Sequence, residues 1–278
     1  MIPAQFDYQR PQTLADAIAL LGSTEDAKIL AGGHSLIPAM KLRLAQPKTV
    51  IDISRLSELS YIREQDGAIA IGAMTTHYAI ESSALLKEKC PLLPEVAAQI
   101  GDVQVRNRGT LGGSIVHADP AADWPAAILA LDAEMDIAGP DGRRTDRAAD
   151  FFVEMMQSAV QPNEILVEIR VPVTARSVAY AKFAQKASGF AIAGVAVVVD
   201  GNNVRVGITG VAAKAYRAEA VEQALRGATL TTDKINAAAA KAADGIESLN
   251  DIHASAEFRA HLARVHTRRA LELAASRS

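Results

Sequence analysis

Cysteine is nearly absent from this 278-residue sequence, and neither sign of charge dominates. Cys90 stands alone, so the chain forms no internal disulfide and has no cysteine cluster for an iron–sulfur centre or a structural zinc. A formal net charge of −3 provides no general basic field for a nucleic acid. We therefore expect a reducing compartment, no metal site in this chain and no nucleic-acid partner.

Long hydrophobic runs are also missing. The longest one, FAIAGVAVVV at 190–199, reaches about half of a membrane span and is typical of a buried strand. The opening MIPAQFDYQR has neither the basic start nor the apolar stretch of a secretory signal. These features predict a soluble cytoplasmic protein without a transmembrane segment.

Several common catalytic motifs do not occur in the sequence. There is no GxGxxG, GxxxxGK[ST], HExxH or GxSxG, which argues against hydride chemistry on a Rossmann domain and against metalloprotease chemistry. His34 and Ser35 are adjacent, a spacing that rarely lets a base reach a nucleophile, and no acid is placed to orient the histidine. We therefore do not expect His34 and Ser35 to act as a base and a nucleophile. His77, His253, His261 and His266 are interpreted as surface or helix residues.

The pattern of the first 175 residues predicts mixed α and β structure in two parts. Segment 1–55 is expected to be a small α/β unit, with a helix after Thr13 and strands at KILAGG and TVIDIS. Segment 56–175 is expected to be a larger α+β unit. It contains hairpins that turn at Asp66-Gly67 and Asp141-Gly142, helices between them, and a strand at 165–173.

The pattern changes at about 174–178. An apolar strand at 190–199, a turn at DGNN and a returning strand VRVGITGVA follow, and the tail from about 218 has helical spacing. Residues 176–278 therefore predict a separate C-terminal domain, an antiparallel sheet with a helical bundle. The fold class is α+β.

Two glycine-rich segments carry the chemistry: Ala31-Gly32-Gly33-His34-Ser35 and Gly109-Thr110-Leu111-Gly112-Gly113-Ser114. Glycines permit positive φ, and consecutive N–H groups can then converge on an anion. Hydroxyl groups in both segments add donors, and a helix is expected to begin after the first. Two tight turns are the alternative interpretation. Together the segments are equally compatible with a clamp for a pyrophosphate.

Acidic residues follow the second segment in HADPAAD. Asp119 or Asp123 is able to accept hydrogen bonds from a ribose, although Asp119 before Pro120 is more typical of a turn or a helix cap. His117 and Asp119 provide only two ligands, too few for a metal site.

These motifs together resemble one known family. AGGHS and TLGGS, with QVRNRGT before and HADPAAD after the second, are similar to the FAD-binding medium subunit of the molybdenum hydroxylases, the relatives of xanthine dehydrogenase and aerobic carbon monoxide dehydrogenase. The resemblance extends over essentially the whole chain, including IPAQFDYQRPQTLADAIALL, EILVEIRVP and YAKFAQKASGFAIAGVAVVV. It implies a two-part FAD-binding domain over 1–175 and a flavoprotein C-terminal domain over 176–278.

The resemblance also implies a set of FAD-binding residues. The first pyrophosphate segment is matched by Ile29, Leu30, Ala31, Gly32, Gly33, His34, Ser35 and Leu36, and the second by Thr110, Leu111, Gly112, Gly113 and Ser114. Ile100 and Asp123 are expected at the adenine and ribose, and Leu166, Lys182 and Phe190 beside the flavin ring. Ser114 stands where many relatives have Asn, and Phe190 where some have Tyr or Trp, so the ring cover is kept without its polar group.

The family further implies electron transfer between partners. FAD in this chain is expected to take electrons from the 2Fe–2S clusters of a small subunit and pass them to an external acceptor. A large molybdopterin subunit oxidises the substrate, in a dimer of heterotrimers. The alternatives are a nucleotide-binding or structural subunit without redox activity, and a standalone flavin oxidase.

Overall fold

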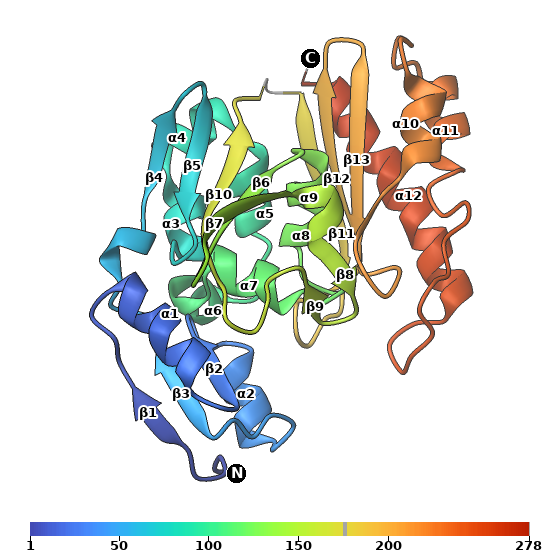
Figure 1. The fold of residues 1–278 in the computed structure, drawn as a ribbon. Helices are drawn as coiled ribbons and strands as arrows, with labels where there is room; N and C mark the ends of the chain where they lie inside the picture. Colours follow the sequence, from blue (N-terminus) through green and yellow to red (C-terminus); the bar gives the residue numbers. More distant parts are fainter. Residues whose placement is uncertain (175–176, 278) are drawn as a thin grey trace.

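The computed structural model describes residues 1–174 and 177–277. Its N-terminal unit, blue in Figure 1, is a small parallel sheet in the order β1-β3-β2 with two helices. Its elements are β1 (Asp7–Gln9), α1 (Leu14–Ser23), β2 (Ala27–Leu30), α2 (Leu36–Lys41) and β3 (Thr49–Asp52). The Thr13 hydroxyl accepts a hydrogen bond from the N–H of Asp16, so α1 begins where the sequence predicts it.

An antiparallel sheet in the order β4-β5-β10-β6-β7 forms the middle of the molecule. Its strands are β4 (Ile62–Gln65), β5 (Ala68–Gly72), β6 (Glu134–Gly139), β7 (Gly142–Arg147) and β10 (Ile165–Pro172). Asp66 and Gly67 both have positive φ and form the turn between β4 and β5. The late strand β10 pairs with β5 on one side and β6 on the other, which joins the two hairpins into one sheet.

Short helices cover one face of this sheet (Figure 1), and the main hydrophobic core lies between these helices and the sheet. A 3-10 turn lies at Ser57–Leu59, and a small hairpin is formed by β8 (Phe152–Glu154) and β9 (Gln157–Ser158). The helices are α3 (His77–Ser82), α4 (Ala84–Lys89), α5 (Leu92–Ala97), α6 (Val103–Arg108), α7 (Leu111–His117), α8 (Trp124–Ala130) and α9 (Ala148–Phe151). Trp124 at the start of α8 is fully buried in this core.

The C-terminal part is an antiparallel sheet in the order β11-β12-β13-β14, flanked by three helices. Figure 1 shows α10–α12 along the outer face of this sheet and α8 along the inner face. The elements are β11 (Val178–Ala184), β12 (Ala191–Asp200), β13 (Asn203–Thr209), β14 (Tyr216–Arg217), α10 (Glu219–Leu225), α11 (Thr232–Ala239) and α12 (Ala256–Ala275). The predicted α+β class is confirmed.

The middle and C-terminal parts share one hydrophobic core. Val178, Tyr180 and Val198, from the inner face of the C-terminal sheet, belong to the same buried cluster as Trp124. Gly207 on β13 allows α8 to pack closely, because a Cβ there would overlap the carbonyl group of Ala126. Within the described residues, no helix is both long and apolar enough to cross a bilayer.

Candidate functional site

The two glycine segments lie directly against each other. We call Ala31–Ser35 the first glycine segment and Gly109–Ser114 the second. Gly32 has no room for a side chain, because a Cβ would overlap the carbonyl oxygen of Arg108 and lie 2.9 Å from the Cα of Gly109. A Cβ on Gly113 would lie 3.4 Å from the Cβ of Ala31. The fold therefore brings together two segments that are far apart in the sequence, as a two-sided clamp requires.

The first glycine segment leaves its backbone donors free. It connects β2 to α2, and Gly33 adopts the left-handed conformation with φ +79°. In the part of the chain that the structure describes, no protein acceptor is recorded for the N–H groups of Gly32, Gly33, His34 or Ser35. His34 and Ser35 are also exposed. A run of free N–H groups next to a helix start is suited to an anion.

The second glycine segment uses its backbone donors within the protein. Leu111 N–H donates to the Thr75 carbonyl and Gly112 N–H to the Ala73 carbonyl, both at 2.9 Å. Gly113 N–H donates to the hydroxyl of Thr110, the N-cap of α7, at 3.2 Å. The prediction of an open loop with positive φ is therefore wrong here: the segment is the first turn of α7. Its hydroxyl groups, rather than its helical N–H groups, remain for a ligand.

His77 packs against the start of the second glycine segment. Its backbone N–H donates to the Gly109 carbonyl at 3.0 Å, and its ring packs against Gly109. Nδ1 of His77 accepts a hydrogen bond from Nε1 of Trp124 at 3.1 Å. Burial, together with the smaller effects of the His34 and Arg106 charges, lowers the pKa of His77 to about 4. The ring is therefore neutral at pH 7. His77 is a helix residue, as its interpretation as a surface or helix residue allowed, but its side chain is buried.

A second polar cluster lies at the contact between the middle part and the C-terminal sheet. Oδ1 of Asp123 accepts from the Tyr180 hydroxyl at 2.5 Å and lies 2.8 Å from Nζ of Lys182. Oδ2 accepts from the same ammonium group at 2.9 Å, and this group also donates to the Gln99 carbonyl at 2.9 Å. The side chains of Asp123 and Lys182 are only 4 % and 3 % exposed.

The charges of this cluster are held in a nearly dry environment. Burial raises the pKa of Asp123, while the Lys182 ammonium and the Tyr180 hydroxyl act in the opposite direction. Burial and the Asp123 carboxylate raise the pKa of Tyr180 well above its usual range. The tyrosine is therefore a hydrogen-bond donor, and Asp123 is oriented by two donors from one strand.

The structure brings together residues that were expected at different parts of FAD. Asp123, expected at the ribose, and Lys182, expected beside the flavin ring, touch each other. Ile100 lies next to Gln99, which Lys182 contacts, and a Cβ added to Gly189 would lie 3.5 Å from the Cα of Gly101. Phe190, 47 % exposed, follows directly. The residues expected at the adenine and some of those expected at the flavin ring therefore occupy one region.

Leu166, the remaining expected residue, is buried in the central strand β10 and belongs to the main core. Sequence reasoning did not find Tyr180, Gln99 or the buried role of His77. Tyr180 and Lys182 are two residues apart on a strand and so point to the same face, a pattern that identifies their common environment. The Gln99 carbonyl carries no such signal.

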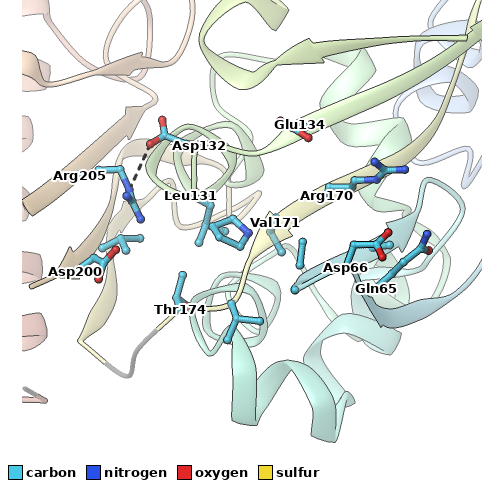
Figure 2. Close-up of a pocket in the computed structure, with 16 residues that line it drawn as sticks. Gln65, Asp66, Leu131, Asp132, Glu134, Arg170, Val171, Thr174, Asp200 and Arg205 are labelled. Carbon is cyan, nitrogen blue, oxygen red and sulfur yellow. Dashed lines mark ion pairs between the residues drawn. The ribbon is translucent and has the colours of Figure 1, made fainter.

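A cavity of about 520 Å³ lies elsewhere, between the end of β10 and the strands β12 and β13. Figure 2 shows its lining, including the ion pair of Arg205 with Asp132. None of its lining residues comes from either glycine segment. Its acidic residues, Asp66, Asp132, Glu134 and Asp200, outnumber its basic residues, Arg170 and Arg205, which disfavours an anion. This cavity is therefore not the pyrophosphate site.

Comparison with known proteins accounts for both halves of the chain. Residues 4–174 match the model of the FAD binding domain in molybdopterin dehydrogenase. The chain belongs to this family. Residues 178–274 match the CO dehydrogenase flavoprotein C-terminal domain. This member of the family is an FAD-binding oxidoreductase subunit, as the resemblance implied.

The similarity to individual family members extends over the full length. The carbon monoxide dehydrogenase medium chain of Hydrogenophaga pseudoflava is 43% identical over 100% of this chain and 99% of its own. The nicotine 6-hydroxylase medium subunit of Paenarthrobacter nicotinovorans is 35% identical, with 98% of each chain covered. A crystal structure of carbon monoxide dehydrogenase from H. pseudoflava superposes with a TM-score of 0.95 at 44% identity, covering 100% and 99%. This family member is therefore the medium subunit of a multi-subunit enzyme.

The residues of the site fit the FAD of this family. The free N–H groups of Gly32–Ser35 suit a pyrophosphate, and Gly32 lets the two segments close on each other without a side chain between them. The exposed ring of Phe190 offers an apolar surface of the kind that an aromatic ring system packs against.

Proposed function

We propose that this chain carries electrons within its complex, from the 2Fe–2S clusters of a small subunit to an external acceptor. When bound, FAD supplies the redox chemistry. The observation that carries the proposal is the first glycine segment, whose free N–H groups lie beside the second segment. The medium-chain names of relatives with different substrates support a division of labour in which another subunit selects the substrate.

The contribution of this chain is to bind and orient the cofactor. We propose the first glycine segment as the main pyrophosphate site, with hydroxyl donors from Thr110 and Ser114 on the other side. Ile29, Leu30 and Leu36 support the first segment, while Leu111, Gly112 and Gly113 shape the second. Asp123, Lys182, Ile100 and Phe190 form the other end of the site, and Leu166 supports it from the core.

We further propose a large molybdopterin subunit and a small iron–sulfur subunit as partners, assembled as a dimer of heterotrimers in the cytoplasm. The single cysteine of this chain, a buried free thiol, supports placing the iron–sulfur clusters in another subunit. Co-expression with candidate partner genes, followed by size-exclusion chromatography and metal analysis, tests the composition. Fractionation of the native host tests the location.

The electron-transfer role has a direct test on the purified full-length chain. It is expected to bind FAD, to be reduced by an artificial donor such as dithionite, and to oxidise no hydroxylase substrate by itself. Adding the reduced iron–sulfur subunit is then expected to bleach the flavin absorption. Substrate oxidation by the isolated chain would instead identify a standalone flavin oxidase. Absence of flavin binding would identify a structural subunit.

A further inference from the structure

The Tyr180–Asp123–Lys182 cluster does more than attach one domain to the other. The inner face of the C-terminal sheet is already held by apolar packing against α8 and by backbone contacts. Ala191 N–H donates to the Ala121 carbonyl at 3.0 Å, and the Thr209 hydroxyl lies 2.8 Å from the carbonyl of Pro120. A buried ion pair loses much of its attraction to desolvation, so docking alone does not explain it.

Through Lys182, the cluster contacts the segment that precedes α6 and the second glycine segment. Lys182 donates to the carbonyl of Gln99, and the chain continues through Ile100 and Gly101 into α6 and then to Gly109. On the C-terminal side, Gly189 packs against Gly101, and Phe190 follows. Lys182, on β11, therefore holds the irregular segment that carries Gln99, next to the point where Gly101 meets Gly189.

The charge of Lys182 is balanced where it lies. Both carboxylate oxygens of Asp123 lie within 2.9 Å of the ammonium group, and the Tyr180 hydroxyl fixes the carboxylate. A cation paired this closely has little field left at a distance, because the two charges oppose each other. The geometry thus favours a mechanical role over an electrostatic one.

We propose that Lys182, oriented by Asp123 and Tyr180, is a positioning residue that fixes Gln99–Gly101 against Gly189–Phe190 and so sets the affinity for FAD without tuning the flavin. This inference rests on the proposed FAD site. It assigns Asp123 a role through Lys182 rather than through a cofactor hydroxyl, and it makes Tyr180 a part of the site.

Four variants of the full-length chain test the inference by FAD titration after removal of the bound flavin. Lys182→Met and Asp123→Asn are each expected to weaken FAD binding about tenfold or more. The double variant is expected to be no weaker than the weaker single variant, because both remove the same link. Lys186, an exposed lysine in the connection between β11 and β12, supplies the matched charge control, and Lys186→Met is expected to bind FAD like the parent.

Two further readouts separate positioning from general destabilisation and from charge. Leu271→Ala, in the core on the far side of the sheet, is expected to lower the melting temperature of the flavin-free chain but to leave FAD affinity within about twofold. The reduction potential of the flavin that Lys182→Met retains, and of Lys186→Met, is expected to equal that of the parent. The visible circular dichroism of bound FAD is expected to change in Lys182→Met and Asp123→Asn but not in Lys186→Met or Leu271→Ala.

Three results would overturn the inference. The first is a shifted reduction potential in Lys182→Met, and the second is a loss of FAD affinity in the double variant that equals the product of the two single losses. The third is a Lys182→Met variant that keeps the FAD affinity of the parent and only melts at a lower temperature. A parent chain that binds no FAD overturns the proposed function instead. If the parent binds FAD and all variants bind it equally tightly, only this inference is overturned.

Discussion

The two glycine segments are alike in sequence and opposite in structure. Gly33 in the first segment has positive φ and stands among unpaired N–H groups. Gly112 in the second is helical, and its N–H group donates to Ala73 on the neighbouring strand end. One glycine pair makes room for a ligand at the backbone, while the other makes room for the protein itself. A glycine pair therefore indicates a close approach, and only the structure tells what approaches.

Gly112→Val, in the second glycine segment, is expected to have the largest effect, and this effect is on the stability of the fold. A Cβ at this position would lie 2.5 Å from the Cβ of Ala73 and 2.8 Å from its carbonyl oxygen, so α7 must move away from the sheet. We expect the flavin-free chain to lose about 3 kcal/mol or more of unfolding free energy. Urea unfolding followed by far-ultraviolet circular dichroism measures this. A stable variant that merely lacks FAD would show that Gly112 faces the cofactor.

Acid should weaken the second segment through His77. Its folded-state pKa is about 4, below the usual pKa of 6.5 for a histidine in an unfolded chain. The unfolded chain therefore binds the extra proton first, and stability falls as pH decreases through 6.5 towards 4. Between pH 7 and pH 5 we expect a loss of about 2 kcal/mol from this residue.

His77→Gln keeps an acceptor for Trp124 and does not titrate, so the acid-induced loss should shrink by about 2 kcal/mol in this variant. Unfolding free energies at pH 7 and pH 5 are compared for the parent, His77→Gln and His34→Gln. His34 lies on the exposed first segment, and its variant is expected to follow the parent. An equal acid sensitivity in His77→Gln and the parent would contradict the assignment.

Gly33→Val should act on the ligand rather than on the fold. Valine resists φ near +79°, at a cost of about 1–2 kcal/mol, and the N–H groups beside it lose their convergence. The nearest obstacle to its Cβ is the flexible end of Ile37, so the fold can adapt. We expect FAD binding to weaken about tenfold to thirtyfold, with a smaller change in the melting temperature of the flavin-free chain. Isothermal titration and thermal unfolding give the two values, and the reverse pattern would refute the comparison.

Thr110→Val gives the smallest expected effect. It removes the hydroxyl that caps α7 through Gly113 and keeps the shape of the side chain. Loss of an N-cap costs about 1 kcal/mol of stability, and the same change removes one hydroxyl proposed to reach the pyrophosphate. Thr231→Val, at the start of α11 and without a side-chain cap bond, is the control. Equal losses in the two variants would mean that the Thr110 cap contributes nothing.

Local elements of the fold were predictable from the sequence. The Asp66-Gly67 turn occurs between paired strands as predicted, and the turn predicted at Asp141-Gly142 lies one residue earlier, at Pro140-Asp141. The apolar run at 190–199 is the strand β12 within one residue. These features depend on turn chemistry and on hydrophobic pattern, which are local properties. The insertion of β10 between two earlier hairpins was not predictable, because strand pairing over long sequence distance leaves no local signal.

The site was predictable in its residue types but not in its arrangement. The residue pattern led to the glycine segments and to Asp123, and the resemblance added Lys182; the fold brings each pair together. The sequence did not show that Asp123 and Lys182 contact each other across two domains, nor that the second segment is helical. Both facts depend on tertiary packing. The start of α7 is set by the carbonyl acceptors of Ala73 and Thr75, which lie in the connection between β5 and α3.

The common core of the middle and C-terminal parts has a consequence for how their coding regions evolve. Val178, Tyr180 and Val198 fill the core that also holds Trp124. A gene rearrangement that separated the two coding regions would produce one product with an uncovered apolar groove and another with an uncovered sheet face. Such products aggregate rather than function. Although the two regions match separate family models, they are expected to be duplicated, fused and exchanged between genomes as a single unit.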